Sequence, residues 1–368
     1  MLSASSHVRR PLTIGIDARA ATEVAAGRGR VVRELLRALA ARQDDPHTYR
    51  CYARTRWPQT LDGRFRWELI DARDPFWHVR TAGAASRHCD VFLSSNSYLT
   101  VPLLRVPSVA IVYDMVAFDR AMAPKRRSAV IERVTLGLAV RRARGLVCIS
   151  QATADTLVAR YPSASGKVTV APLGVSPALT APPAEELAEL PAGGFVLAVG
   201  TLEPRKNLPR LVAAYATLPR ALQDEHRLVV VGARGWNTGP TLAALRSLGD
   251  RCAMLGHVTD GALAELYRRS AVFCYPSLGE GFGLPVLEAM AAGAAVLTSD
   301  VSSLPEVGGN AVEYVDPESV ESIAAGLERL LTSAQRRAAL GSLARERATR
   351  FSWERTAEVV LAALDSAA

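Results

Sequence analysis

The sequence has no long apolar run and no cysteine pattern that would place it in a membrane or an oxidising compartment. No stretch reaches the ~18 uninterrupted apolar residues that a membrane-spanning helix needs. Arg9 and Arg10 are not followed by an apolar core, so we do not expect a signal peptide. The five cysteines are scattered, without the spacing of a metal site (Cys51, Cys89, Cys148, Cys252 and Cys274). These absences favour a cytoplasmic protein with reduced thiols.

Histidine is also scarce, and none of the six histidines stands in a local motif. They are His7, His47, His78, His88, His226 and His257. Because histidine is the side chain that most readily exchanges a proton near neutral pH, we do not expect a catalytic imidazole.

What is present is the composition of an ordinary soluble α/β protein. Of 368 residues, 49% are hydrophobic and 22% are charged, which is typical of globular domains. This length is sufficient for two domains. Prolines interrupt any regular element between Leu173 and Gly194. This interruption predicts a linker that divides a first domain, residues 1–175, from a second, residues 176–351.

A glycine-rich segment in the second half predicts a phosphate site. The apolar strand pattern 271–275 leads into G-E-G-F-G-L-P-V-L-E, residues 279–288. Gly281 and Gly283 allow a close backbone approach that a Cβ would forbid, and Pro285 suits the first turn of a helix. The start of that helix would present free N–H groups and a partial positive charge to an anion.

Two carboxylates flank this phosphate seat. Glu280 lies in the loop and Glu288 about one turn into the helix. We expect Glu288 to hold a ribose hydroxyl pair, because it is too close to a phosphate site to be a generic surface charge. For a lone glycine-rich loop, an ordinary turn with solvated glutamates would be the better interpretation.

A second strand-to-helix loop points to the same ligand. It reads G-T-L-E-P-R-K-N, residues 200–207, between a continuous apolar strand at 195–199 and an amphipathic helical pattern that starts at Leu208. Arg205 and Lys206 therefore lie where open α/β sheets bind ligands. Cations at a helix start oppose the helix dipole, so their presence there invites an anion.

The stretch from about 195 to 355 resembles the nucleotide-binding half of glycosyltransferase family 4, whose members are retaining enzymes of GT-B fold. The matching segments occur in the family's order and spacing: VGTLEPRKN (199–207), LVVVGARGW (228–236), the long segment 255–317 and FSWERTA (351–357). The resemblance implies an α/β chain of GT-B fold, with two Rossmann-like parallel-sheet domains facing a cleft. It also implies that a C-terminal helix, residues 352–368, packs back on the first domain.

The resemblance extends to the reaction. The E-P-R-K-N form is similar to mannosyl- and rhamnosyl-type transferases of bacterial surface-polysaccharide assembly. It implies transfer of a hexose, of mannose or deoxyhexose type, from a nucleoside-diphosphate sugar to a glycan or lipid-linked saccharide acceptor. The chain contains no Asp-x-Asp, the acidic pair that seats a divalent cation in the other large transferase fold. We therefore expect no metal and no cofactor.

Roles for individual residues follow from this resemblance. Arg205, Lys206 and the N–H groups of residues 281–284 would neutralise the leaving diphosphate. Glu280 would lie beside the sugar, without acting as a covalent nucleophile. His257 would line the base site rather than act as a catalyst. The implied donor-binding set is Gly200, Thr201, Arg205, Lys206, His257, Val258, Glu280, Gly281, Phe282, Gly283, Leu284 and Glu288, with Glu280, Arg205 and Lys206 as the catalytic members.

The first half carries weaker signals of the acceptor side. Its expected strands are 12–16, 91–94, 109–113 and 145–149, and its expected first long helix is 31–41. Gly27 and Gly29 lie in G-R-G-R, which is similar to the glycine loop that opens the same family, although a flexible turn needs nothing more. Ser150 fits the family's strand-end serine, but it also suits the cap of a helix that begins near Ala152.

The sequence departs from the family at Tyr113 and Asp114, where family members usually have His-Asp. A tyrosine can hydrogen-bond a sugar hydroxyl but does not exchange a proton near neutral pH. The alternative is that Tyr113 ends a buried strand and Asp114 caps the next segment.

Charge is divided unevenly between the halves. Residues 1–180 hold 27 Lys and Arg against 14 Asp and Glu, whereas the remainder holds 17 against 22. The excess of basic residues lies at 125–127, at Arg133 and at 141–144. This pattern suits an anionic membrane surface or a diphosphate-lipid acceptor, although an arginine-rich proteome would produce the same excess. We expect no nucleic-acid partner, because no aromatic or helix-turn-helix reader accompanies the charge.

Two other classes remain open besides a transferase. A GT-B sugar-nucleotide epimerase would act without an acceptor, and a phosphorylase-like enzyme would need a pyridoxal-binding lysine that no motif suggests. A non-catalytic binding protein of the same fold is disfavoured by the complete set Glu280, Glu288, Arg205 and Lys206, although Tyr113 leaves room for it.

Overall fold

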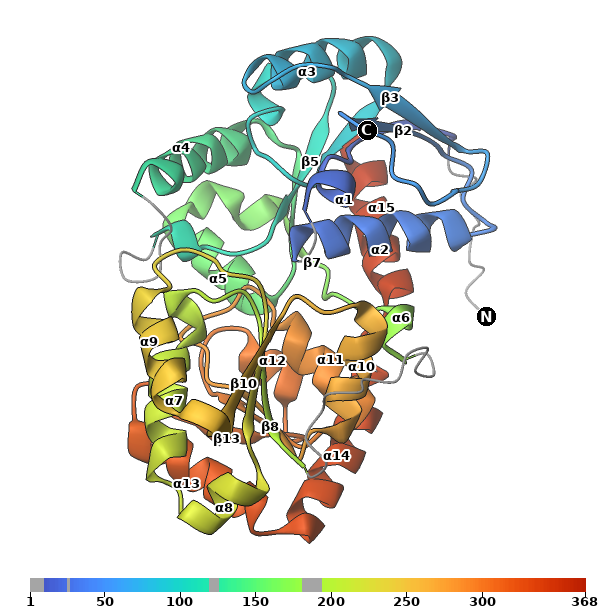
Figure 1. The fold of residues 1–368 in the computed structure, drawn as a ribbon. Helices are drawn as coiled ribbons and strands as arrows, with labels where there is room; N and C mark the ends of the chain where they lie inside the picture. The colour runs from blue at the N-terminus through green and yellow to red at the C-terminus, as the bar shows by residue number, and fades with distance from the viewer. Residues whose placement is uncertain (1–9, 25–26, 119–125, 181–193) are drawn as a thin grey trace.

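The computed structural model describes residues 10–24, 27–118, 126–180 and 194–368. The chain forms two lobes, each built around one β-sheet, and Figure 1 shows them one above the other. All strand pairings in the two sheets of the described chain are parallel. The α/β class with two parallel sheets, predicted from the sequence, is thereby confirmed.

The first sheet has seven strands, with β1 and β4 as neighbours at its centre. Their order is β3 (Phe65–Leu69), β2 (Thr48–Ala53), β1 (Thr13–Asp17), β4 (Val91–Ser94), β5 (Ser108–Val112), β6 (Gly145–Cys148) and β7 (Val168–Val170). The helices of this lobe are α1 (Ala20–Glu23), α2 (Arg28–Ala41), α3 (Phe76–His88), α4 (Arg126–Arg142) and α5 (Gln151–Arg160), with 3-10 turns η1 (Val101–Leu103), η2 (Val116–Phe118) and η3 (Pro162–Lys167). Strands β4 and β5 are buried along their whole length, because helices cover both faces of a parallel sheet.

The second sheet has six strands, with β8 and β11 as neighbours at its centre. Their order is β10 (Cys252–Gly256), β9 (Leu228–Val231), β8 (Val196–Val199), β11 (Val272–Tyr275), β12 (Val296–Ser299) and β13 (Glu313–Val315). The surrounding helices are α7 (Leu208–Thr217), α8 (Arg220–Glu225), α9 (Gly239–Ser247), α10 (Asp260–Arg269), α11 (Leu284–Ala292), α12 (Leu304–Gly308), α13 (Val320–Leu331) and α14 (Ala334–Ala348), with η4 (Pro204–Lys206) and η5 (Gly249–Arg251). In both sheets the chain reverses its winding at the two central strands, and ligands bind at such switch points.

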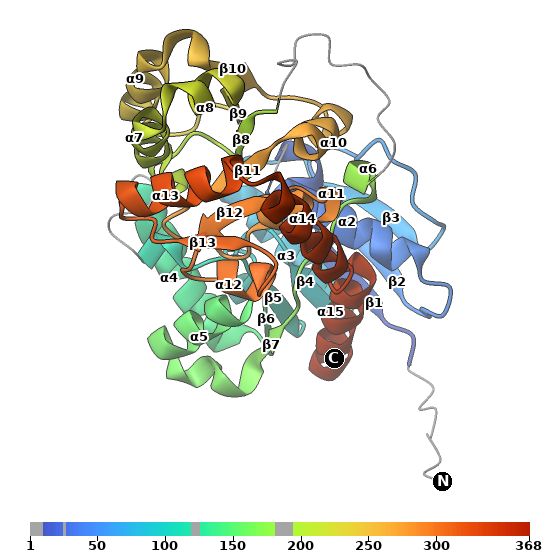
Figure 2. The same cartoon turned by 90° about the horizontal axis from the view of Figure 1, so that it is seen from below.

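The chain passes between the lobes in two places. The first passage follows β7 and includes α6 (Pro177–Thr180); Pro182, Pro183 and Pro191 of the expected linker lie outside the described residues. The second passage joins α14 of the second lobe to α15 (Trp353–Ala367), which packs on α2 and on strands β4 to β7 of the first lobe. Figure 2 shows the two red helices, α14 and α15, following one another towards the C-terminus.

The apolar core also continues across the lobes. One buried cluster contains Ile14 and Leu35 of the first lobe, Phe273 of the second and Trp353 of α15. Such continuity ties the lobes together by burial of apolar surface as well as by polar contacts. No helix in the described part of the chain is both long and apolar enough to cross a bilayer.

Candidate active site

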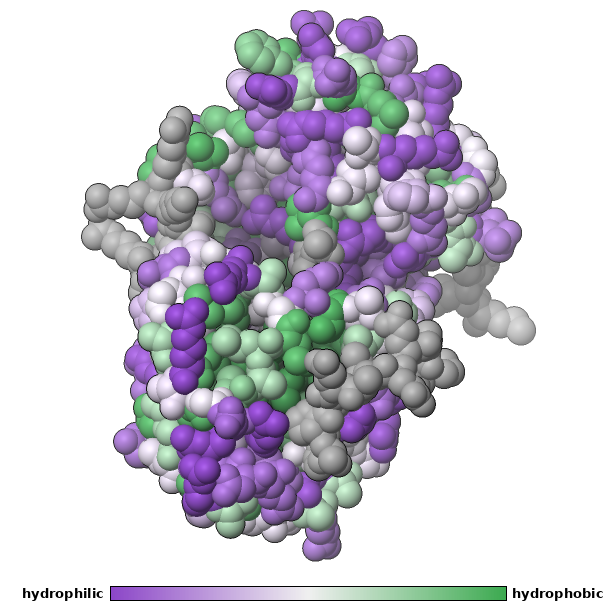
Figure 3. Space-filling model, viewed as in Figure 1, coloured by the Kyte–Doolittle hydropathy of each residue, from purple (hydrophilic) through white to green (hydrophobic). Residues whose placement is uncertain are grey.

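A cleft between the lobes lies at the carboxyl ends of both sets of central strands. It encloses a cavity of about 360 Å³, within the range of small-molecule sites. The lining comes from both lobes: Gly27, Arg28, Arg30, Val31, Tyr113, Asp114, Ile149 and Leu173 from the first, and Val199, Gly200, Thr201, Glu203, Arg205, Lys206, Leu263, Tyr275, Glu280, Gly281, Phe282, Gly283, Leu284, Pro285 and Glu288 from the second. Figure 3 shows the hollow where the lobes meet, with hydrophilic residues along its upper side.

The loop after β8 brings Arg205 and Lys206 to this cleft. Pro204 starts the short turn η4, and Asn207 ends it in a left-handed conformation with φ of 59°. The buried Asn207 amide donates to the carbonyls of Pro276, at 3.0 Å, and Pro317, at 2.6 Å. These bonds fix the loop after β8 against the loop after β11, so the two predicted motifs meet as expected for neighbouring strands.

Glu280 is held at the centre of this junction. Its Oε1 accepts hydrogen bonds from Lys206 Nζ at 2.7 Å, the Ser277 hydroxyl at 2.6 Å and the Tyr275 hydroxyl at 2.8 Å. Its Oε2 pairs with Arg205. Burial alone would raise the pKa of Glu280, but the Arg205 and Lys206 cations outweigh it and hold that pKa at about 2. The carboxylate is therefore ionised at any physiological pH.

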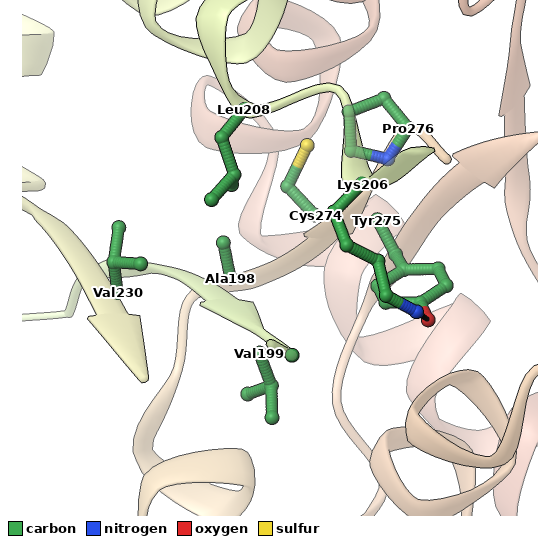
Figure 4. A pocket seen from close by; sticks show the side chains of 9 residues that line it. Ala198, Val199, Lys206, Leu208, Val230, Cys274, Tyr275 and Pro276 are labelled. Carbon is green, nitrogen blue, oxygen red and sulfur yellow. Dashed lines mark hydrogen bonds between the residues drawn. The ribbon is translucent and has the colours of Figure 1, made fainter. Parts of the chain in front are cut away.

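The Lys206 side chain lies along Tyr275, with its ammonium beside the phenol oxygen (Figure 4). The apolar side chains around its stem, among them Leu208 and Cys274, leave a space of only about 10 Å³, which is close to the size of one water molecule. Burial lowers the pKa of Lys206, and Glu280 acts against that fall. Any ligand must therefore meet Lys206 from the cleft side.

The start of α11 completes the predicted phosphate seat. Gly283 has φ of 104°, a left-handed conformation that favours glycine. Gly281 has a different reason to be glycine: a Cβ there would lie 1.8 Å from the carbonyl oxygen of Tyr113 in the first lobe. The glycine-rich loop thus contacts both the cleft and the opposite lobe.

Glu288 faces an unexpected partner from the other lobe. Its Oε1 accepts a hydrogen bond from Arg30 Nη1 at 2.6 Å, and its Oε2 accepts one from the Tyr267 hydroxyl at 3.0 Å. Arg30 lies in α2 and also pairs with Asp260 at the start of α10. Burial raises the pKa of Glu288, while Arg30 and Tyr267 act against that rise. A charge network thereby joins the two lobes across the cleft.

Some of the site residues expected in the first lobe line the cavity, and others do not. Gly27, Tyr113 and Asp114 line the cavity. Tyr113 is buried and its hydroxyl donates to the Ser95 carbonyl oxygen at 2.5 Å, while Asp114 Oδ1 accepts from the backbone of Val116 at 3.0 Å. Tyr113 thus follows a buried strand and Asp114 forms a local cap, while both residues also line the cavity.

Several expected site residues do not line the cavity. Ser150 caps α5, accepting a hydrogen bond from the Thr153 backbone at 3.1 Å. Gly29 is buried in the first turn of α2, where a Cβ would lie 1.7 Å from the Val24 carbonyl oxygen. His257 and Val258 follow β10 outside the cavity lining, and the His257 side chain is exposed.

Other residues of the site were missed at the sequence level. Arg28, Arg30, Glu203 and Tyr275 line the cavity, whereas the sequence predicts only the glycines of G-R-G-R as site residues. Cations in the first turn of a helix oppose its dipole and indicate an anion nearby, so Arg28 and Arg30 carry the same signal as Arg205. In the part of the chain that the structure describes, no group of three or more His, Cys, Asp or Glu could hold a metal ion.

Comparison with known proteins gives one matching family description for each lobe. Residues 25–179 match Glycosyltransferase Family 4, and residues 186–347 match Glycosyl transferases group 1. A curated relative, the O-antigen chain mannosyltransferase B of Escherichia coli, is 41% identical over 164 residues. The match covers 44% of this chain and 43% of the relative, so the chain spans less than half of that relative's length.

Solved structures are similar over nearly the whole chain. Sucrose-phosphate synthase from Thermosynechococcus elongatus has a TM-score of 0.77 at 21% identity, over 96% of this chain and 98% of that one. Anabaena HepE in complex with UDP-glucose has a TM-score of 0.74 at 17% identity, over 96% and 100%. At these identities the likeness shows the fold, which is GT-B. With a family match on each lobe and this fold, the chain belongs to glycosyltransferase family 4.

Proposed function

We propose that this protein is a retaining, metal-independent glycosyltransferase that moves a hexose from a nucleoside-diphosphate sugar to a glycan or lipid-linked saccharide. The observation that carries the proposal is the convergence of Arg205, Lys206 and the start of α11 in one cavity. Similarity to an O-antigen mannosyltransferase supports mannose as the sugar, and a deoxyhexose is the other sugar type that the sequence predicts. Retention of the anomeric configuration is the outcome expected for this family.

In the reaction, the bond between the anomeric carbon and the phosphate oxygen breaks, and its electron pair stays with the diphosphate. The acceptor oxygen forms the new bond to that carbon, and its proton passes to the departing diphosphate. Arg205 and Lys206 would stabilise the charge that grows on the leaving group. We assign Glu280 to the sugar and Glu288 to the ribose, as the sequence predicts.

Before the donor binds, the charges in the cleft are compensated by one another. Four cations and four carboxylates line the cavity: Arg28, Arg30, Arg205 and Lys206 against Asp114, Glu203, Glu280 and Glu288. A diphosphate adds negative charge to this balanced set. Donor binding therefore has to rearrange existing ion pairs, with the phosphates taking over cations that Glu280 and Glu203 now hold.

A donor panel tests the proposed function. Thermal shift with GDP, UDP, ADP and dTDP identifies the nucleotide, because a ligand that binds the native state raises apparent stability. The corresponding radiolabelled sugars are then supplied with membrane saccharide extract, with and without EDTA. We expect sugar incorporation that survives EDTA; loss of activity in EDTA would overturn metal independence. Conversion of the donor without acceptor would instead identify an epimerase.

We propose that the protein binds an anionic membrane surface and takes its acceptor there. Helix α4 forms the flank of the first lobe in Figure 1 and exposes one apolar stripe, made up of Val130, Ile131, Val134 and Leu138. Arg141, Arg142 and Arg144 are exposed at its end. An apolar stripe with basic residues is the pattern of helices that lie in a lipid interface.

Not every cation of the first lobe contributes to this surface. Arg133 points inward, where its Nε donates to the Ala117 carbonyl oxygen at 2.6 Å and its guanidinium lies over Phe118. Lys125 lies outside the described residues. The proposed membrane surface therefore consists of the apolar stripe of α4 and the cations 141–144 that follow it.

A further inference from the structure

Arg30 occupies a costly position that the proposed reaction does not explain. It lies in the first turn of α2, where the helix dipole disfavours a cation, and its side chain is only 14% exposed. Two carboxylates of the other lobe, Glu288 and Asp260, compensate this position. Because both partners belong to the second lobe, these ion pairs exist only while the lobes are closed on each other.

The carboxylate that Arg30 holds is the one assigned to the ribose. Glu288 is 5% exposed, and each of its oxygens already accepts a hydrogen bond, one from Arg30 and one from Tyr267. A vicinal ribose diol donates two hydrogen bonds to one carboxylate. With Arg30 on Oε1 and Tyr267 on Oε2, a ribose diol has to compete with partners that are already in place.

Arg30 and Glu288 both line the cavity. Asp260 is much more accessible than Glu288, with a side chain 49% exposed. Arg30 can therefore give up Glu288 and keep Asp260 as its partner, without leaving a buried cation unpaired. If Arg30 gave up Asp260 instead, it would stay paired with the buried Glu288.

We propose that Arg30 and the ribose of the donor compete for Glu288. In the nucleotide-free enzyme the Arg30–Glu288 ion pair holds the lobes together, and nucleotide binding replaces it. Arg30 thus acts as a positioning residue that sets nucleotide affinity. This proposal rests on the proposed function through the assignment of Glu288 to ribose.

The size of the effect follows from population arithmetic. A ligand that binds only the form with Glu288 free has an apparent dissociation constant raised by the inverse of that form's population. If the ion pair is closed in about nine molecules of ten, its removal tightens binding about tenfold. The gain belongs to the ribose hydroxyls alone, because the phosphates and the base do not contact Glu288 in this assignment.

Calorimetry on the full chain tests the competition. The ligands are GDP and UDP, each beside its 2′,3′-dideoxy analogue, and the proteins are wild type, Arg30→Ala and Arg30→Gln. Arg37→Ala is the matched control, an arginine of the same helix that pairs with Glu34 within its own lobe. Arg30→Gln keeps most of the side chain and serves if the alanine variant does not fold.

We expect both Arg30 variants to bind the preferred ribonucleotide about tenfold more tightly, with no gain for the dideoxy analogue and no change in Arg37→Ala. The gain should vanish when Glu288→Gln is added. Unchanged or weaker ribonucleotide binding, or an equal gain for the dideoxy analogue, overturns the competition alone. If no nucleoside diphosphate binds any of the proteins, the proposed function fails, and the competition fails with it.

Discussion

At the scale of single residues, Glu280 compensates the cations Arg205 and Lys206 in the donor-free cleft. Arg205 also donates to the Gly279 carbonyl oxygen at 2.9 Å and to Glu203 at 2.6 Å. The guanidinium is thus oriented from three sides in the donor-free cleft, and the rearrangement of its contacts to Glu203 and Glu280 belongs to donor binding. Stabilisation by preorganised charge costs no rearrangement at the moment of reaction. Substitution of Arg205 or Lys206 should therefore have the largest effect on turnover.

Arg205→Ala and Lys206→Ala should each lower turnover by about 10²- to 10³-fold, because each removes a charge that we propose faces the leaving diphosphate. Turnover of the labelled donor, measured by product formation, checks this. Arg220→Ala removes an exposed arginine that pairs with Asp224 on α8, and it should be silent. Near-wild-type turnover in both cleft variants would show that this loop does not hold the diphosphate.

The two glutamates should separate nucleotide binding from turnover. Glu288→Ala removes the carboxylate assigned to ribose, so we expect weaker binding of the nucleoside diphosphate itself. Glu280→Ala leaves Arg205 and Lys206 available to phosphate, so nucleotide binding should persist while turnover is lost. Calorimetry beside kinetics measures both effects. Equal losses of nucleotide affinity in the two variants would contradict this division of roles.

At the scale of elements, the sequence predicts the buried central strands well, but it misses β2, β3 and β7 of the first sheet, and it predicts the contacts between distant elements poorly. The strands expected at 91–94 and 271–275 are β4 and, within one residue, β11, because buried parallel strands are continuous apolar runs. Helix α2 begins one turn earlier than expected, at Arg28. Local patterns contain no information on the pairing of Arg30 with Glu288, which is 258 residues away in the chain.

The exposed face of α4 should govern lipid binding. Val134 is 57% exposed, so Val134→Glu should leave the fold intact while it places a negative charge on the stripe. We expect at least about tenfold weaker binding to anionic vesicles, in sedimentation at low salt. Leu343→Glu, at a 42% exposed position on α14 of the second lobe, is the control. If both variants bind like wild type, α4 is not the membrane surface.

The glycine-rich loop should limit how far the lobes close. In Gly281→Ala the new Cβ would meet the Tyr113 carbonyl oxygen of the other lobe, so the lobes must separate. Because a displacement of about 1 Å can cost about 100-fold in rate, we expect at least that loss, together with a larger radius of gyration in small-angle scattering. Gly261→Ala has no atom within 4 Å of its new Cβ and should change neither quantity.

At the scale of the whole molecule, acid should weaken the fold through a histidine that has no role in the site. His78 is buried in α3, where its Nδ1 contacts the Thr100 hydroxyl at 2.8 Å. Burial, together with the Arg19 cation, lowers the pKa of His78 to about 4. At pH values between the pKa of His78 in the folded chain and the ordinary histidine pKa of about 6.5, His78 is protonated in the unfolded chain but not in the folded chain.

The contribution of His78 should therefore lower the free energy of unfolding by about 3 kcal/mol as the pH drops from about 6.5 to about 4. Chemical denaturation at a series of pH values measures this dependence. His78→Asn keeps a polar partner for Thr100 and has no titrating group, so its stability should fall less over the same interval. Parallel curves for wild type and the variant would assign the acid sensitivity elsewhere.

The first lobe is complete only after α15, the last helix of the chain, has been synthesised. Strand β7 ends the first sheet at Val170, but the buried face of α15, with Trp353, Val360 and Leu364, is needed to cover that sheet. On a ribosome that adds about 5 to 20 residues per second, the first sheet waits on the order of 10 to 40 s for its last helix. The lobe that is synthesised first is therefore finished last, and throughout that interval it exposes apolar surface to chaperones.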